Sequence, residues 1–155
     1  MRIESFLRQS PVFQAGRVAR RLDASLSLLL AGEELSVFEA LLLAAIFLEK
    51  SGGERRGIKP SELAEAFQTT RGNVSHCISS LEAKGLVERR IDPEDARAFQ
   101  LLLKPLGRRR AVRVAGILDR TQRQMEEQVG AAKLETMLQQ MSVVAELGER
   151  LAGRR

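Results

Sequence analysis

Cysteine, histidine and the large aromatic residues are scarce in this chain of 155 residues, which has one Cys, one His and neither Trp nor Tyr. Cys77, as the only cysteine, cannot form an intrachain disulfide, so we expect a reducing, intracellular compartment. One His and one Cys cannot build a His/Cys metal cluster within one chain, and we expect no metal and no other cofactor. His76 is the sole candidate base and no neighbouring serine suits the role of its nucleophile, so we expect no enzyme.

Long apolar runs are absent as well. The longest uncharged apolar run, Ala40 to Leu48, is far shorter than the roughly 20 residues that a membrane-spanning helix needs. The first eight residues interrupt their apolar positions with charge, which is not typical of a secretory signal. An apolar content of 44% and a charged content of 29% favour a folded globular protein. We therefore expect a cytoplasmic protein with no membrane partner.

Positive charge is concentrated in the middle of the chain. The net charge is +5, and the region Arg55 to Arg110 holds twelve Lys or Arg against seven Asp or Glu, so the remainder is neutral. A basic middle between neutral flanks indicates a module that faces nucleic acid. The alternative is a solvated basic face in an Arg-rich composition, and charge alone does not separate the two.

Apolar residues at helical spacing predict a mainly helical protein. Ser10 and Pro11 begin a first helix that ends at Gly32, and Ser36 with Glu39 forms a capping box at the start of a second, nearly all-apolar helix that we expect at the centre of the fold. The further predicted elements are a short helix at 61–67, a helix at 71–84 capped by Thr70 and ended by Gly85, β-strands at 86–91 and 99–103, and helices at 105–129 and 133–152.

This order predicts a winged helix-turn-helix, because a short helix, a turn and a second helix precede a β-hairpin with a charged tip. On the helix at 71–84 the apolar residues fall on one side. The opposite side is small, polar and poor in carboxylates, with Glu82 at its edge, whereas an ordinary solvent-facing helix more often carries Glu/Lys pairs. Such a surface suits the major groove of DNA.

The candidate DNA-contacting residues lie on this helix and on the hairpin. Arg71 could instead pair with Glu65. For the hairpin, we expect one arginine to enter the minor groove and one acidic residue to orient it, the alternative being an ordinary hairpin with scattered charge. The candidates are Arg71, Asn73, Ser75, His76 and Ser79 for the major groove, Arg97 for the minor groove, Asp95 as the partner that orients Arg97, and Arg89, Arg90 and Ser80 for the DNA backbone.

Three segments resemble the MarR family of bacterial transcription regulators: 61–64 (SELA), 72–87 (GNVSHCISSLEAKGLV) and 92–97 (DPEDAR). The resemblance implies that the helix at 71–84 enters the major groove, that Arg97 enters the minor groove, and that the terminal helices form a dimer. The chain departs from the family at Leu103-Lys104-Pro105, where the family usually has Leu-Thr-Pro. Lys104 thus removes an expected N-cap, worth about 1 kcal/mol.

The expected organisation has three parts: an N-terminal helix at 1–35 that belongs to the dimerisation region, a winged helix-turn-helix at 36–105, and dimerisation helices at 106–155. Apolar stripes on the last two helices are too long to be covered by the small DNA-reading part, which favours a homodimer, although packing on the first helix explains part of each stripe. Two-fold pairing would place two reading helices about one turn of DNA apart and predicts a palindromic operator.

The predicted function is therefore a sequence-specific, DNA-binding transcription regulator, a repressor acting at the nucleoid. A small aromatic or anionic effector is a further expectation from the family. Cys77 lies on the inward side of its helix, where burial makes a thiol inert, so we interpret it as a core residue rather than a redox sensor. The alternatives are a helical protein–protein adaptor and a ligand-sensing relative without operator binding.

Overall fold

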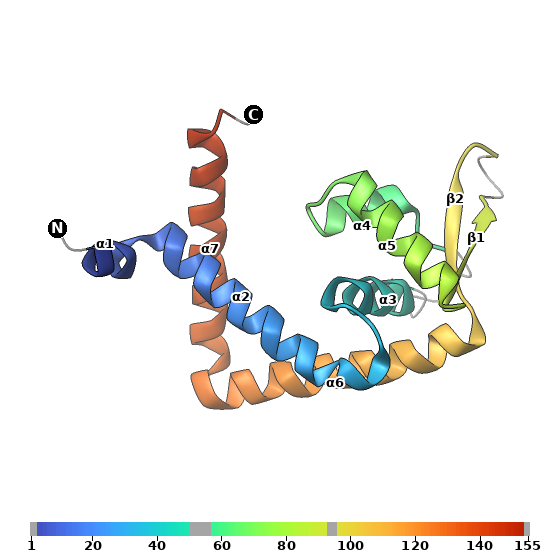
Figure 1. Ribbon diagram of the computed structural model, residues 1–155, viewed down its shortest axis with the longest axis horizontal. Helices are drawn as coiled ribbons and strands as arrows, with labels where there is room; N and C mark the ends of the chain where they lie inside the picture. Colours follow the sequence, from blue (N-terminus) through green and yellow to red (C-terminus); the bar gives the residue numbers. More distant parts are fainter. Residues whose placement is uncertain (1–2, 50–56, 93–95, 154–155) are drawn as a thin grey trace. The chain divides into compact units, whose positions relative to one another are not determined.

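The computed structural model describes residues 3–49, 57–92 and 96–153 (Figure 1). It divides into two compact units, Met1–Ala115 and Gly116–Arg155. The described elements are α1 (Ile3–Gln9), α2 (Pro11–Leu29), the 3₁₀-helix η1 (Ala31–Glu33), α3 (Val37–Glu49), α4 (Pro60–Ala66), α5 (Arg71–Ala83), β1 (Val87–Ile91), β2 (Phe99–Leu103), α6 (Pro105–Val129) and α7 (Ala131–Leu151). The expected fold class, mainly helical with a small β-wing, is confirmed.

The helices begin where the predicted caps lie. The Ser10 hydroxyl accepts the Phe13 N–H at 3.3 Å at the start of α2. In the capping box of α3, the Ser36 N–H donates to the Glu39 carboxylate at 2.8 Å and the Glu39 N–H donates to the Ser36 hydroxyl at 3.2 Å. These contacts satisfy backbone donors that a helix N-terminus otherwise leaves without a partner.

The end of α5 also follows the prediction. Gly85 has a φ of +69°, which glycine adopts without steric cost. The Gly85 N–H donates to the Glu82 carbonyl and the Leu86 N–H donates to the Leu81 carbonyl, both at 2.9 Å. This is the Schellman pattern, which turns the chain directly from α5 into β1.

Helix α3 lies at the centre of the first unit, as its uniformly apolar sequence predicts. Its buried apolar residues pack with those of α5 and the hairpin, and burial of such side chains is the main driving force for folding. The fully buried large side chains are Leu30, Leu42, Leu43, Ile46, Leu63, Val74, Ile78, Leu81, Leu86, Val87, Leu101 and Val114.

Strands β1 and β2 form an antiparallel hairpin whose register pairs Val87 with Leu103 and Ile91 with Phe99. Ile58 adds a β-bridge to Leu101, so the segment just before α4 is held against the hairpin. At the other edge, Gly107 of α6 lies against the backbone of Leu86, and a Cβ at Gly107 would lie 1.9 Å from the Leu86 carbonyl oxygen. Only glycine allows this close approach.

Two differences from the sequence-based expectation concern the helical flanks. Helix α1 was not predicted, because seven residues are too few to show a clear apolar period. Helix α7 begins two residues earlier than expected, at Ala131, after Gly130 with a φ of +94°. Within the described residues, every helix is too short or too polar to cross a bilayer. The functional boundary expected at residue 105 remains a prediction, since the two compact units divide within α6.

Candidate nucleic-acid interface

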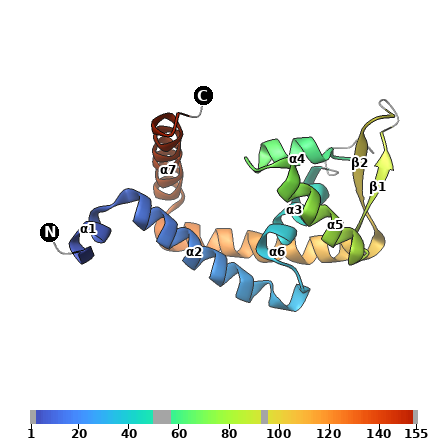
Figure 2. The ribbon, with the colours of Figure 1, turned by 45° about the horizontal axis from the view of Figure 1, so that its top comes forward.

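Helix α5 lies beside α4 and next to the hairpin (Figure 2), and it also contacts α3. The turn from α4 to α5 is tight: the Thr69 N–H donates to the Ala64 carbonyl at 2.9 Å, and Gln68 adopts a left-handed φ of +47°. The Thr70 hydroxyl then caps α5 by accepting the Asn73 N–H at 3.1 Å. This arrangement is a helix-turn-helix followed by a wing.

The two faces of α5 differ as the sequence predicts. Val74, Cys77, Ile78 and Leu81 are buried against the core. The exposed residues of the helix carry small or polar side chains and no carboxylate: Arg71, Gly72, Asn73, Ser75, His76, Ser79 and Ala83. An α-helix with such a surface can approach base edges closely and offer hydrogen-bonding groups to them.

The first turn of α5 holds two of the candidate residues. The Asn73 side-chain amide donates to the Thr69 hydroxyl at 3.1 Å, which orients the amide at the helix start. Arg71 is exposed, and the ion pairs of the described residues do not include one with Glu65. A cation in the first turn is disfavoured by the helix dipole, whereas a phosphate there is favoured by both the dipole and the arginine.

Ser79 and Arg89 connect α5 to the hairpin. The Ser79 hydroxyl donates to the Ser75 carbonyl at 3.0 Å and accepts from the Arg89 guanidinium at 3.1 Å. The same guanidinium lies 3.3 Å from the Glu82 carboxylate. The one carboxylate at the edge of the reading face is therefore paired with an arginine, which reduces its repulsion of a phosphate backbone.

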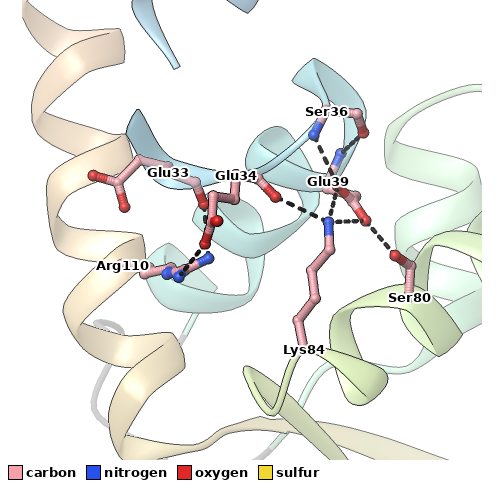
Figure 3. Close-up of polar contacts among 7 residues, drawn as sticks. All are labelled: Glu33, Glu34, Ser36, Glu39, Ser80, Lys84 and Arg110. Atoms are coloured by element: carbon pink, nitrogen blue, oxygen red, sulfur yellow. Dashed lines mark hydrogen bonds and ion pairs between the residues drawn. The ribbon is translucent and has the colours of Figure 1, made fainter. Parts of the chain in front are cut away.

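Ser80 is oriented differently from the other candidates. It is half-buried, and its hydroxyl donates to the Glu39 carboxylate of α3 (Figure 3). Because that contact turns the hydroxyl toward the interior, we omit Ser80 from the proposed set of DNA-contacting residues. The sequence pattern placed Ser80 at the border between the two faces of α5, and its long-range partner decided on which side the hydroxyl lies.

The wing carries the remaining candidates. Arg90 is exposed and pairs with Glu88 two residues earlier at 2.6 Å, and Arg97 is exposed near the end of the turn. Asp95 lies outside the described residues. At the base of the wing, Asp92 is buried, with its carboxylate 2.8 Å from the Lys59 ammonium, and its N–H donates to the Ala98 carbonyl at 2.9 Å. Lys59 and Asp92 thus tie the wing to the start of α4.

Cys77 is buried on the core side of α5. Burial, and to a smaller extent the Glu39 carboxylate, raise the pKa of its thiol to about 11, against a smaller lowering by the Lys84 ammonium. The thiolate is the reactive form, so the thiol is inert at neutral pH. This environment supports the interpretation of Cys77 as a core residue.

The sequence predicted Ser80 as a DNA-backbone contact, but it assigned no site role to Glu39, to Lys84, or to the pair of Lys59 and Asp92. Each joins side chains from different elements, and local patterns do not report such contacts. The only local signal was the capping box, which marked Glu39 as a helix-start residue and not as a partner of α5. Among the described residues, no group of three or more His, Cys, Asp or Glu side chains could hold a metal ion.

The fold and the arrangement of α4, α5 and the hairpin define a winged helix-turn-helix protein. Residues 53–99 match the sequence model of the MarR family. The transcriptional repressor MprA of Escherichia coli is 38% identical over 69 residues, which are 44% of this chain and 38% of the repressor. The matched part of this chain thus spans less than half of that relative.

Solved structures extend the likeness to nearly the whole chain. The MepR–DNA complex of S. aureus has a TM-score of 0.73 at 18% identity, covering 94% of this chain and 97% of MepR. CouR of Rhodococcus jostii RHA1, bound to p-coumaroyl-CoA, has a TM-score of 0.73 at 19% identity, covering 90% of this chain and 94% of CouR. At these identities the likeness establishes the fold, including the flanking helices.

Proposed function

We propose that this protein is a sequence-specific DNA-binding regulator of transcription that binds a palindromic operator as a homodimer and acts as a repressor in the cytoplasm. The observation that carries the proposal is the exposed face of α5, which is small, polar and without a carboxylate, next to a wing with exposed arginines. The MprA relative is a transcriptional repressor, and MepR was solved in complex with DNA.

The proposed DNA contacts follow from the positions of the candidate residues on α5 and on the wing. Arg71, Asn73, Ser75, His76 and Ser79 read the major groove, Arg97 enters the minor groove with Asp95 as its partner, and Arg89 and Arg90 bind phosphates. Arg89 bridges Ser79 and Glu82. Binding by Arg89 to a phosphate therefore requires exchange of these contacts for a charge-assisted hydrogen bond to the phosphate.

The homodimer is supported by the helices that flank the reading part. None of the residues of α1, α2 or α7 is buried in the single chain. Apolar faces of this length are covered by a partner in stable proteins, and a second copy of the chain supplies a matching surface through two-fold symmetry. The exposed apolar side chains of α7 are Met137, Leu138, Met141, Val143, Val144, Leu147 and Leu151.

The decisive experiment is selection of bound duplexes from a random pool with purified protein, followed by a salt titration on the selected sequence. We expect a palindrome with half-sites about one helical turn apart, and an affinity that falls steeply with salt, with a log–log slope near −0.9 per phosphate contacted. A protein–protein adaptor would enrich no sequence and show no such slope.

We further propose that a small aromatic or anionic molecule releases the DNA. The structure of CouR with p-coumaroyl-CoA supports an effector for proteins of this fold. Aromatic acids and their thioesters should be screened for a rise in melting temperature, and each positive compound then added to the protein–operator complex. A compound that stabilises the protein and weakens operator binding is an effector, whereas stabilisation with operator binding intact contradicts the proposal. A ligand-sensing relative without operator binding would bind such compounds but select no DNA.

A further inference from the structure

Glu39 is a buried carboxylate with partners on three sides (Figure 3). It lies in the first turn of α3 with 7% of its surface exposed. One oxygen accepts the Ser36 N–H at 2.8 Å, and the other accepts the Ser80 hydroxyl. The Lys84 ammonium lies 2.9 and 2.8 Å from the two oxygens. The carboxylate therefore joins the start of α3 to the last turn of α5.

The Glu39 carboxylate is held in its charged form. Burial alone would raise its pKa, but the hydrogen bonds from Lys84, Ser80 and the Ser36 N–H outweigh burial and lower the pKa below its ordinary value. A buried ionised group needs such partners, since loss of one leaves a charge without compensation. The contact to α5 is therefore a fixed feature of the folded state.

Ser80 and Lys84 are four residues apart and lie on the same face of α5, one turn from each other. Two contacts at this spacing define how the helix is rotated about its own axis. The apolar side of α5 packs on the core through Val74, Ile78 and Leu81, but hydrophobic burial is not directional. Hydrogen bonds depend strongly on distance and angle, so the polar contacts restrict rotations that the apolar packing permits.

The turn before α3 extends this cluster to α6. The Lys84 ammonium also donates to the Glu34 carbonyl at 3.0 Å, and the Arg110 guanidinium donates to the Glu33 carbonyl at 2.7 Å and to the Glu34 carboxylate at 3.2 Å. The Glu33 carboxylate accepts two bonds from Arg113, at 2.7 and 2.8 Å. Residues 33 and 34 are thus held from α5 on one side and from α6 on the other.

We infer that Glu39, acting through Ser80 and Lys84, is a positioning residue that fixes the orientation of α5 and thereby sets how well the protein distinguishes its operator from other DNA. The inference rests on the proposed function. A rotation of α5 would displace Ser75, His76 and Ser79 together, because they share the outer face of one rigid helix. Base-specific contacts depend on this placement, whereas contacts to the phosphate backbone depend on it less.

The chain offers a matched control for the test. Glu62 occupies the same capping position in α4 as Glu39 does in α3, and its carboxylate accepts the Lys59 N–H at 2.6 Å. Glu62 is exposed, and its hydrogen bond with the Lys59 N–H is local to the start of α4. Glu39→Gln and Glu62→Gln therefore remove the same charge from the same place in a capping box, and only the first weakens a contact to α5.

We expect Glu39→Gln to lower affinity for the selected operator by roughly tenfold, a typical coupling between sites, while affinity for an unrelated duplex at the same salt changes by less than about twofold. Glu62→Gln should preserve the ratio of the two affinities. Urea unfolding of each variant establishes that it is folded under the binding conditions. A preserved ratio in Glu39→Gln, or an equal loss in both variants, overturns the inference.

Ser80→Ala provides a second route, because it removes one contact to Glu39 with little disturbance of packing. If Ser80 acts through Glu39, the effects of Ser80→Ala and Glu39→Gln on the affinity ratio are not additive in the double variant. Additive effects would make Ser80 an independent DNA contact and contradict the inference.

Failure of the proposed function can be distinguished from failure of the positioning role of Glu39. If the wild-type protein selects no sequence, the proposed function fails, and the positioning role is then judged by amide hydrogen exchange without DNA. Faster exchange in α5 of Glu39→Gln than of Glu62→Gln supports the contact as the restraint on α5. Equal exchange in the two variants overturns it.

Discussion

Substitution of Arg97 tests the contribution of the wing to DNA binding separately from that of α5. It is exposed near the end of the turn. We expect Arg97→Ala to weaken operator binding by about 1–3 kcal/mol without changing the preferred bases in the major groove. Binding to the selected operator and to single-base variants of it measures both effects.

The control for this change is Arg123→Ala in the second unit, where Arg123 is exposed and pairs with Asp119 of its own helix. It removes the same charge outside the proposed interface and should leave affinity unchanged. A shift in base preference at the inner half-site positions of Arg97→Ala, with affinity intact, would contradict a minor-groove role.

Glu33 and Glu39 make the stability of the protein depend on pH. The hydrogen bonds from Arg113 lower the pKa of Glu33, and those to Glu39 lower its pKa despite burial. A carboxylate whose folded-state pKa is depressed stabilises the fold above its unfolded-state pKa, and this contribution is lost as the pH falls through the folded-state pKa. The free energy of unfolding should therefore decrease below about pH 4.5, the ordinary pKa of a Glu carboxyl group.

Urea unfolding of the wild type and of Glu33→Gln across this range tests the assignment. Glu33→Gln lacks one of the two depressed groups, so the stability difference between the two proteins should be largest near neutral pH and shrink in acid. A difference that is constant with pH would show that the charge of Glu33 makes no contribution.

At the scale of elements, the sequence predicts starts and ends of helices well because caps are local. Ser10, Ser36 and Thr70 each accept a backbone N–H three residues later, and Gly85 ends α5. The exposed face of α5 was predictable for the same reason, since helical spacing alone separates it from the apolar face. In contrast, Ser80 and Glu39 are 41 residues apart, and their contact depends on how α3 and α5 pack.

The packing of α6 on the start of β1 is tested by Gly107→Ala. The added Cβ would lie 1.9 Å from the Leu86 carbonyl oxygen, so the helix or the strand must move. We expect a loss of about 1–3 kcal/mol in the free energy of unfolding, measured in urea.

Gly116→Ala is the matched control in the same helix, because there the nearest atom, the Arg120 guanidinium, is at 3.5 Å, an ordinary contact. Replacing glycine with alanine within a helix stabilises it by about 1 kcal/mol where space allows. Equal effects of the two substitutions would mean that the close approach at Gly107 is not restrictive.

At the scale of the whole molecule, the proposed dimer depends on the apolar side of α7. Met141 lies on this side and is 45% exposed in the single chain. We expect Met141→Glu to shift the protein from dimer to monomer in sedimentation experiments, because a charge at the centre of a dimer contact must be desolvated. Operator binding should weaken with it, since two half-sites are then bound independently.

Gln139→Glu is the control, because Gln139 is exposed on the opposite side of α7 and the substitution adds the same charge. It should leave the dimer intact. A wild-type protein that sediments as a monomer at micromolar concentration would contradict the proposed assembly, whatever the behaviour of the variants.

The inward position of Cys77 makes the protein suitable for a simple kinetic assay. As the only cysteine in the chain, it is the only site that a thiol reagent can modify. A thiol with a pKa of about 11 on the buried side of α5 reacts only when the helix opens. The rate of modification therefore measures how often α5 opens locally. An operator duplex that holds this helix in place should slow this rate, and the assay needs no introduced label.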